Sequence, residues 1–196
     1  MKKIEIIWRE LLFSGLEKNE RHFEQKKLAK KFGFSTSTVF QALKIPRKMG
    51  AVRVTGRFFI LENPEKLLYH WASVRSLEKD ILSAFRIEDP VFEAEGKMPP
   101  EVIYGAYSAA RLRLDVSPSD YDKIYVYSDQ PEKIKERTIV TKGVPNLFVL
   151  KPDKFLSLYG QKTTLAQTFV DIWNLRDWYA KEYTEALKEK INAILS

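Results

Sequence analysis

Hydrophobic residues recur at helical spacing near the start of the chain and predict two helices. The first is an amphipathic helix over residues 2–18 with one buried stripe. The members of this stripe are Ile4, Ile7, Trp8, Leu11 and Leu12. The second helix has an inner face of Leu28, Ala29 and Phe32, and Gly33 fits the left-handed cap that ends such a helix. The pattern therefore predicts two helices before position 34.

A third helix and a hairpin follow directly. Ser35 occupies the position of an N-cap, and Pro46 and Gly50 indicate where the helix tightens and closes. Its inward residues are Val39, Ala42 and Leu43. The β-prone runs 51–54 and 58–61 flank Thr55-Gly56 and predict a β-hairpin.

Charge is distributed unevenly along the 196 residues. Residues 1–61 hold 14 Lys and Arg against 5 Asp and Glu, which gives +9, whereas the whole chain carries +7. The remaining residues are therefore slightly acidic. Positive charge gathered at one end of a chain indicates a polyanionic partner for that end.

The order helix, helix, turn, helix, hairpin resembles the winged helix-turn-helix superfamily. The matching core and turn positions are Leu28-Ala29, Gly33-Phe34-Ser35, Val39, Ala42-Leu43, Met49-Gly50 and Val52. The resemblance covers about a third of the chain. It implies that the helix from Ser35 enters a DNA major groove, while Arg53 and Arg57 in the wing contact the backbone or the minor groove.

The side chains around this helix suit DNA recognition. The start of the helix carries Ser35 and Thr36, and Ser37, Thr38 and Gln41 have hydrogen-bonding groups that can meet base edges. Cations that can neutralise phosphates surround them, namely Lys26, Lys27, Lys30, Lys44, Arg47 and Lys48. Two other interpretations remain open at this point: the lysines form an ordinary solvated helix face, or the unit binds another protein.

The rest of the chain mixes helical and strand patterns. From Glu65 onward, Leu67, Leu68, Trp71, Val74 and Leu77 predict a helix that braces the two parts of the protein. Predicted strands are 91–94, 102–104, 123–127 and 147–150, and predicted helical segments are 106–114, 132–137 and 152–158. Two helices close the chain within 163–195. For Trp173, Trp178, Tyr179 and Tyr183 in this last region, we expect a place in the core, with a surface for a partner as the other interpretation.

Composition excludes several kinds of protein. With 44% hydrophobic residues, the chain is expected to fold, and no apolar run is long enough to cross a bilayer. The absence of cysteine excludes disulfides and thiolate chemistry, and only two histidines, His22 and His70, are present. We expect His70 to be a core or interface residue. The sequence predicts a cytoplasmic protein without a cofactor.

One motif in the second half resembles the nucleotidyltransferase signature. The turn Tyr104-Gly105-Ala106 is followed by Asp120-Tyr121-Asp122 ahead of a strand. In that superfamily the turn holds nucleotide phosphates and the two aspartates bind Mg²⁺ on one face of a strand. Ala106 departs from the usual Gly or Ser, and Lys123 stands where an apolar residue is usual. Asp120 and Asp122 are therefore an alternative catalytic pair, with a degenerate nucleotidyltransferase scaffold as the other interpretation.

A second resemblance spans most of the chain. The basic winged helix is followed by residues 108–112 (SAARL) and 163–172 (TTLAQTFVDI), which are similar to the AbiEi family of antitoxins in abortive-infection systems. The resemblance implies a DNA-binding autoregulator with a nucleotidyltransferase-like toxin as its partner. The matching aspartate is Asp171, for which pairing with a neighbouring arginine, such as Arg176 or Arg111, is the plain structural interpretation.

Together these patterns predict an α+β protein of two domains. Residues 1–63 are expected to form a winged helix-turn-helix, and residues 64–196 a mixed α/β domain with two long C-terminal helices. The protein is expected to be a transcriptional regulator that binds double-stranded DNA as a homodimer. If it is an antitoxin, a toxin protein is its expected partner. The alternatives are the Mg²⁺-dependent nucleotidyltransferase and a protein-interaction module.

Overall fold

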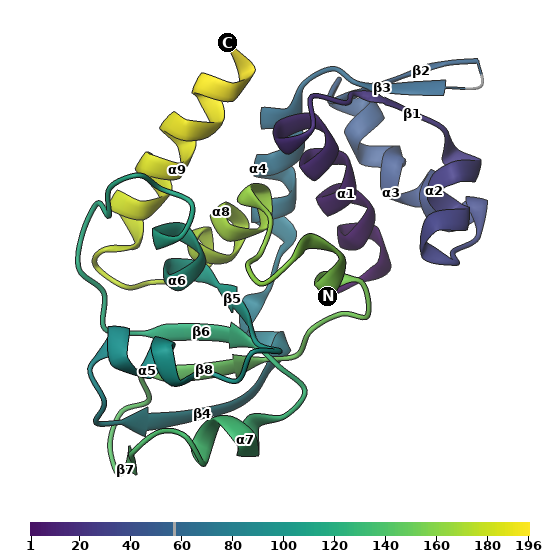
Figure 1. Ribbon diagram of the computed structural model, residues 1–196. Coiled ribbons are helices and arrows are strands. Elements are labelled where there is room, and N and C mark those ends of the chain that lie inside the picture. Colours follow the sequence, from purple (N-terminus) through teal and green to yellow (C-terminus); the bar gives the residue numbers. More distant parts are fainter. Residues whose placement is uncertain (57) are drawn as a thin grey trace.

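The computed structural model describes residues 1–56 and 58–196 and shows an α+β fold (Figure 1). In the described residues, nine α-helices accompany two β-sheets, one of three strands and one of five. The α+β class that the sequence predicts is thereby confirmed.

The first part of the chain follows the predicted order of elements. Its helices and strands are α1 (Lys3–Glu17), β1 (His22–Phe23), α2 (Gln25–Phe32), α3 (Thr36–Lys48), β2 (Val52–Thr55), β3 (Phe58–Leu61) and α4 (Pro64–Val74). The three strands form an antiparallel sheet in the order β1-β3-β2. The sequence did not predict β1, because two residues are too few to show an alternating pattern.

Local signals set the ends of α2 and α3. Gly33 ends α2 in the left-handed conformation at φ 61°, which costs glycine little. Ser35 is the N-cap of α3, and its hydroxyl accepts a hydrogen bond from the backbone N–H of Thr38 at 3.1 Å. Pro46 lies inside α3, which continues to Lys48. The helix thus ends just before Gly50, the residue that the sequence predicts to close it.

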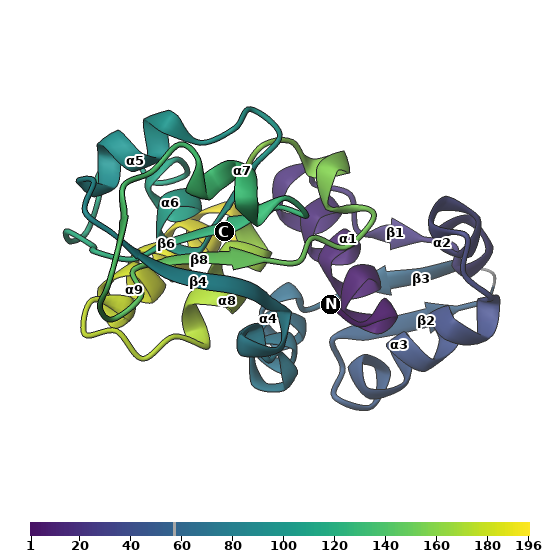
Figure 2. The same ribbon diagram turned by 90° about the horizontal axis from the view of Figure 1, so that it is seen from below.

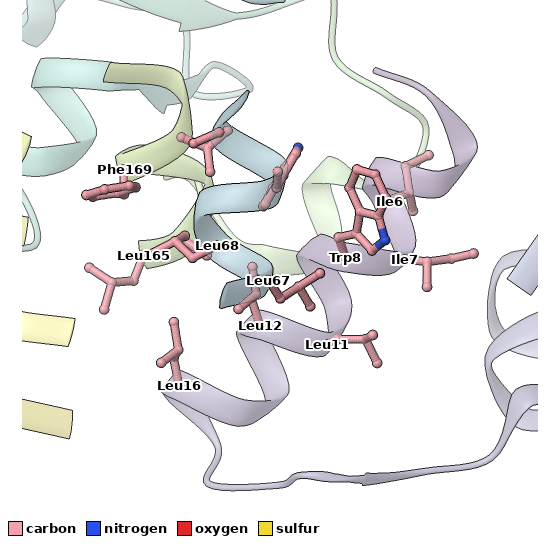
Figure 3. Close-up of a cluster of buried hydrophobic side chains, with 14 of the residues drawn as sticks. Ile6, Ile7, Trp8, Leu11, Leu12, Leu16, Leu67, Leu68, Leu165 and Phe169 are labelled. Carbon is pink, nitrogen blue, oxygen red and sulfur yellow. The ribbon is translucent and has the colours of Figure 1, made fainter. Parts of the chain in front are cut away.

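Helix α1 is buried on nearly all sides, not along a single stripe as its sequence predicts. It lies between the five-stranded half of the protein and the group of α2, α3 and the hairpin (Figures 1 and 2). Figure 3 shows Ile7 and Leu11 pointing to one side of α1, while Leu12 and Leu16 point towards α4 and α8 (Leu165–Trp173). One hydrophobic cluster thus continues from α3 through α1 into α4 and α8.

The second part of the chain is built on a mixed sheet. Its strands are β4 (Ile81–Ile87), β5 (Ile103–Gly105), β6 (Ile124–Tyr127), β7 (Val140–Thr141) and β8 (Leu147–Leu150). Its helices are α5 (Val91–Lys97), α6 (Ala106–Arg111), α7 (Pro131–Lys135), α8 and α9 (Ala180–Leu195), with short 3-10 turns at Leu77–Asp80 and Leu156–Tyr159. The strand order is β5-β6-β8-β4-β7, in which only β6 and β8 run parallel among the described strands.

Both faces of this sheet are covered. Ile124 and Val126 of β6 join a hydrophobic cluster that includes residues of α5 and α7. Tyr125 and Tyr127, which alternate with them, join the larger cluster with α6 and α8. Because side chains alternate across a strand, burial of all four β6 residues places helices on both sides of the sheet.

Several element predictions after position 64 are corrected by the structure. Residues 91–94 lie in helix α5 and not in a strand. The long helix expected from Glu65 ends at Val74, and its last predicted part belongs to a 3-10 turn and to β4. Of the two closing helices, α8 has only nine residues and α9 has sixteen.

The aromatic residues near the C-terminus divide between core and surface. Tyr179 and Tyr183 are buried, as the sequence predicts. Trp173 and Trp178 keep 50% and 76% of their surface exposed, so their expected place in the core is wrong. Within the described residues, the structure holds no helix with the length and apolarity needed to traverse a bilayer.

Candidate nucleic-acid interface

Helix α3 is fixed to the protein by its inner face. Val39, Ala42, Leu43 and Pro46 are buried, and the indole Nε1–H of Trp8 in α1 donates to the carbonyl oxygen of Ala42 at 2.7 Å. Proline has no N–H, so Pro46 cannot make the usual hydrogen bond to this carbonyl four residues earlier. Trp8 supplies the missing donor and joins α3 to the central helix.

The opposite face of α3 is open to solvent. Ser37, Gln41, Lys44 and Lys48 are exposed and recur every three or four residues, which places them on one side of the helix. This face carries polar groups that can reach base edges, followed by two cations near the C-terminal end of the helix. The structure thus brings together the central part of the predicted DNA-contacting set.

Two predicted contact residues have a local role instead. The hydroxyls of Ser35 and Thr38 lie 2.9 Å apart, and Ser35 also accepts the backbone N–H of Thr38. Thr38 is only partly exposed. These two residues hold the start of α3, whereas the neighbouring Thr36 and Ser37 are exposed.

The cations of α3 stand without carboxylate partners. Lys44, Arg47 and Lys48 are exposed, and none of them makes an ion pair within the described part of the chain. Elsewhere many cations are paired, for example Arg9 with Asp153 at 2.7 Å and Arg113 with Glu17 at 2.9 Å. The unpaired charge on α3 is therefore available to an anionic partner.

The lysines of α2 divide into free and paired groups. Lys26 and Lys30 are exposed and make no ion pair in the residues that the structure describes. Lys27 pairs with Glu24 at 2.8 Å, and this contact raises the pKa of Lys27. Lys31 contacts the buried carboxylate of Glu10 and so joins α2 to α1. Lys26 and Lys30 are the stronger phosphate-contact candidates of this helix.

The hairpin provides a further predicted contact. Arg53 of β2 is more than half exposed and pairs with Glu62, which lowers its capacity to bind phosphate. Arg57, predicted as the second contact of the wing, lies outside the described residues. Gly56 at the hairpin turn has a φ of 59°, a conformation that favours glycine.

A groove separates the hairpin from the two helices. Its volume is about 620 Å³, and its walls come from the start of α2, the start of α3 and the hairpin. The lining residues are Glu24, Gln25, Lys26, Thr36, Gly56 and Phe58. Residues at the starts of both helices, Lys26 and Thr36 among them, thus line the groove together with the acidic Glu24.

The candidate interface lies at one end of the molecule. In both whole-molecule views, α2, α3 and the hairpin lie away from the five-stranded sheet (Figures 1 and 2). Residues 25–61 contain nine Lys and Arg and no Asp or Glu. The exposed outer face of α3 is thus not covered by the other half of the chain.

Asp171 belongs to a buried ionic network and not to an exposed site. Its carboxylate accepts from Arg75 Nε at 3.1 Å and from the hydroxyl of Tyr127 at 2.6 Å. Arg75 also binds Asp80 at 2.6 Å and lies 3.7 Å from Glu5 of α1. Burial raises the pKa of Asp171, and the nearby guanidinium of Arg75 opposes this rise. The expected pairing of Asp171 with an arginine is therefore confirmed, but the partner is Arg75 and not Arg176 or Arg111.

The two aspartates of the alternative catalytic motif lie in the loop before β6. This strand begins only at Ile124, so Asp120 and Asp122 do not share a strand face. The carboxylate of Asp122 accepts the hydroxyl of Tyr179 at 2.6 Å. Among the described residues, no group of three His, Asp or Glu side chains is placed to hold a metal ion.

The turn of the same motif is explained by packing. A Cβ added at Gly105 would lie 2.8 Å from Cε2 of Tyr127, so the tyrosine ring requires glycine there. Tyr127 is the residue that binds Asp171. Ala106 has a φ of 41°, which is unusual for a residue with a side chain. Gly105 therefore leaves room for the ring of Tyr127, which belongs to the buried ionic network.

Comparisons with protein-family models, with curated proteins and with solved structures returned no match.

Sequence reasoning missed two features of this region. Phe40 of α3 is 45% exposed although it follows the buried Val39, and no periodic pattern identified it. Trp8 was expected to be a core residue only, because a hydrogen bond across 34 positions has no sequence signal. A proline inside a helix is the signal that could have suggested such a donor.

Proposed function

We propose that this protein is a transcriptional regulator that binds double-stranded DNA through α3 and the β2–β3 hairpin. The order α1, β1, α2, α3, β2, β3 and the strand order β1-β3-β2 support assignment of the N-terminal unit as a winged helix-turn-helix. In this docking mode the second helix of the helix-turn-helix lies in the major groove and the hairpin contacts the adjacent backbone.

The observation that carries the proposal is the outer face of α3. It exposes Ser37 and Gln41 beside Lys44 and Lys48, with no carboxylate anywhere in residues 25–61. Amide and hydroxyl groups suit base edges, and unpaired cations suit phosphates. A surface for a protein partner would more often be poor in charged residues at its centre. The charge and the polar groups together favour a nucleic acid.

The proposal is tested by measuring the binding of a fluorescently labelled random-sequence duplex by anisotropy between 50 and 200 mM salt. Binding should weaken steeply with salt, because neutralised phosphates release counterions. The variant Lys44→Ala/Arg47→Ala should bind at least about tenfold more weakly at moderate salt and lower the logarithmic salt slope by about two.

A matched control removes the same charge elsewhere. Lys142→Ala/Arg176→Ala also replaces one exposed lysine and one exposed arginine, both outside the N-terminal unit. We expect this variant to bind like the wild type. Equal weakening by the two variants would show that only net charge matters, and an unchanged affinity of the α3 variant would remove α3 as the contact surface.

The regulator proposal includes a homodimer on DNA, because two-fold operators engage two copies of a helix-turn-helix. Sedimentation with and without duplex tests this part. The antitoxin assignment rests on the resemblance to the AbiEi family, and an adjacent gene for a nucleotidyltransferase-like toxin would support it.

A further inference from the structure

Phe40 lies in a hollow on the surface of α3. Its side chain is 45% exposed, although Val39 and Leu43 of the same helix are fully buried. The hollow has a volume of about 370 Å³, and Phe40, Lys44, Arg47 and Lys48 line it. One aromatic side chain and three cations without ion-pair partners in the described residues therefore line this hollow.

The charge of this hollow restricts its occupant. A second copy of the same surface would bring three cations against three cations, which is unfavourable without intervening carboxylates. The occupant must combine negative charge with an apolar projection. The major groove of DNA offers this combination, since the thymine C5-methyl group projects into the groove between two rows of phosphates.

We propose that Phe40 is a specificity-determining residue that contacts a thymine methyl group in the major groove, while Lys44, Arg47 and Lys48 bind the flanking phosphates. This inference rests on the proposed function and adds a base preference to it. Apolar side chains, phenylalanine among them, are known partners of this methyl group. Gln41, one position further along α3, is exposed and can bind a neighbouring base edge.

The test begins with a duplex of defined sequence. Wild-type protein selects its best site from a pool of random duplexes, and each thymine of that site is then replaced singly by uracil. Uracil lacks only the C5-methyl group and keeps the same hydrogen-bonding edge. At one or two positions, we expect the replacement to weaken wild-type binding about three- to fivefold, as expected for one buried methyl group.

Three variants separate a direct contact from a general effect. In Phe40→Ala the same uracil replacements should change the affinity less than about 1.5-fold, because the methyl partner is absent. Phe40→Leu keeps an apolar side chain, so uracil replacement should weaken its binding nearly as much as it weakens wild-type binding. Phe92→Ala removes another exposed phenylalanine, 60% exposed, which lies in α5 outside the candidate interface, and it should behave like the wild type.

Each outcome is decisive. The proposed contact would be overturned if uracil replacement weakened binding equally in wild type and Phe40→Ala. It would also be overturned if no thymine-to-uracil replacement weakened wild-type binding. In both cases the proposal of duplex binding would stand. Failure of the wild type to bind any duplex would overturn the proposed function and this inference together, as would binding to anionic lipid vesicles in place of DNA. Because Phe40 is exposed, its variants are expected to fold, which thermal melting monitors.

Discussion

The indole N–H of Trp8 donates to the carbonyl oxygen of Ala42, the carbonyl that Pro46 leaves without a backbone donor. The distance is 2.7 Å, and both groups are buried. An unsatisfied buried carbonyl costs about 1–3 kcal/mol, so this contact offsets the penalty of a proline inside the helix. It also fixes α3 to α1, the helix shared by both parts of the protein.

We expect Trp8→Phe to lower the free energy of unfolding by about 1–3 kcal/mol, because the carbonyl of Ala42 loses its donor. Chemical denaturation measures this change. In a Pro46→Ala background, the backbone N–H of the new alanine can bind Ala42, so the same Trp8→Phe replacement should cost clearly less. Equal costs in both backgrounds would show that Trp8 acts through packing alone.

The second prediction concerns the buried pair of Arg75 and Asp171. Burial opposes charge on Arg75, but Asp171 and Asp80 outweigh it and raise the pKa of the guanidinium. Arg75→Met leaves the fully buried Asp171 without its cation, and we expect a loss of about 3–5 kcal/mol in denaturation. Adding Asp171→Leu should recover a large part of this loss.

A surface pair serves as the control for this prediction. Lys181 and Glu185 lie 3.8 Å apart with exposed side chains, and Lys181→Met should change stability by less than about 0.5 kcal/mol. A small effect of Arg75→Met would contradict a structural role for the network that joins α1, α4 and α8.

The third prediction is a pH dependence that originates at His70. Its ring lies edge-on to Trp8 at 4.9 Å, and burial lowers its pKa below the ordinary value of 6.5. As pH falls through about 6.5, the unfolded chain binds a proton before the folded protein does, so stability decreases towards acidic pH. Melting temperatures at pH 7.5 and 5.5 should differ more for wild type than for His70→Gln.

The exposed His22 provides the comparison, since His22→Gln should keep the wild-type difference. If His70→Gln and wild type lose the same stability on acidification, the dependence comes from other groups.

The fourth prediction separates base recognition from phosphate binding on α3. Gln41→Ala should reduce the preference for a selected site over random duplex by about tenfold and leave the salt slope unchanged. Lys48→Ala should weaken binding to all sequences and lower the slope by about one. Competition binding at several salt concentrations distinguishes the two, and identical behaviour of the variants would refute the division of roles.

The fifth prediction addresses the nucleotidyltransferase alternative. Because Asp120 and Asp122 lie in a loop and Asp122 binds Tyr179, we expect Mg²⁺ with a nucleoside triphosphate to leave the melting temperature within about 1 °C. A larger rise that disappears in Asp120→Asn/Asp122→Asn would instead establish a nucleotide site.

The sequence predicted the N-terminal elements well because their signals are local. Gly33 and Ser35 fix a helix end and a helix start within three residues, and the apolar spacing of α3 identified its buried face. In the second part, the run 147–150 was predicted with correct bounds as β8. Such segments are recognisable because propensity, spacing and neighbouring turns all indicate the same structure.

Predictions failed where distant contacts decide the structure. Leu77 continues the helical spacing of α4, but the chain leaves the helix at Arg75, whose side chain binds Asp80 and Asp171. Residues 91–94 have strand-like composition, yet they form α5, which covers one face of the sheet with Ala94 buried. Local preference of a few residues is weaker than the burial that the sheet provides.

The amino-acid order alone determined the basic character of the first sixty residues, the helix ends at Gly33 and Ser35, and the polar groups of α3, since these depend on residue type and near neighbours. Only the tertiary structure decided that α1 is buried on both sides, that the indole N–H of Trp8 donates to the carbonyl of Ala42, and that Arg75 pairs with Asp171. These relationships join residues far apart in the chain, and their energy appears only when folding removes the groups from water.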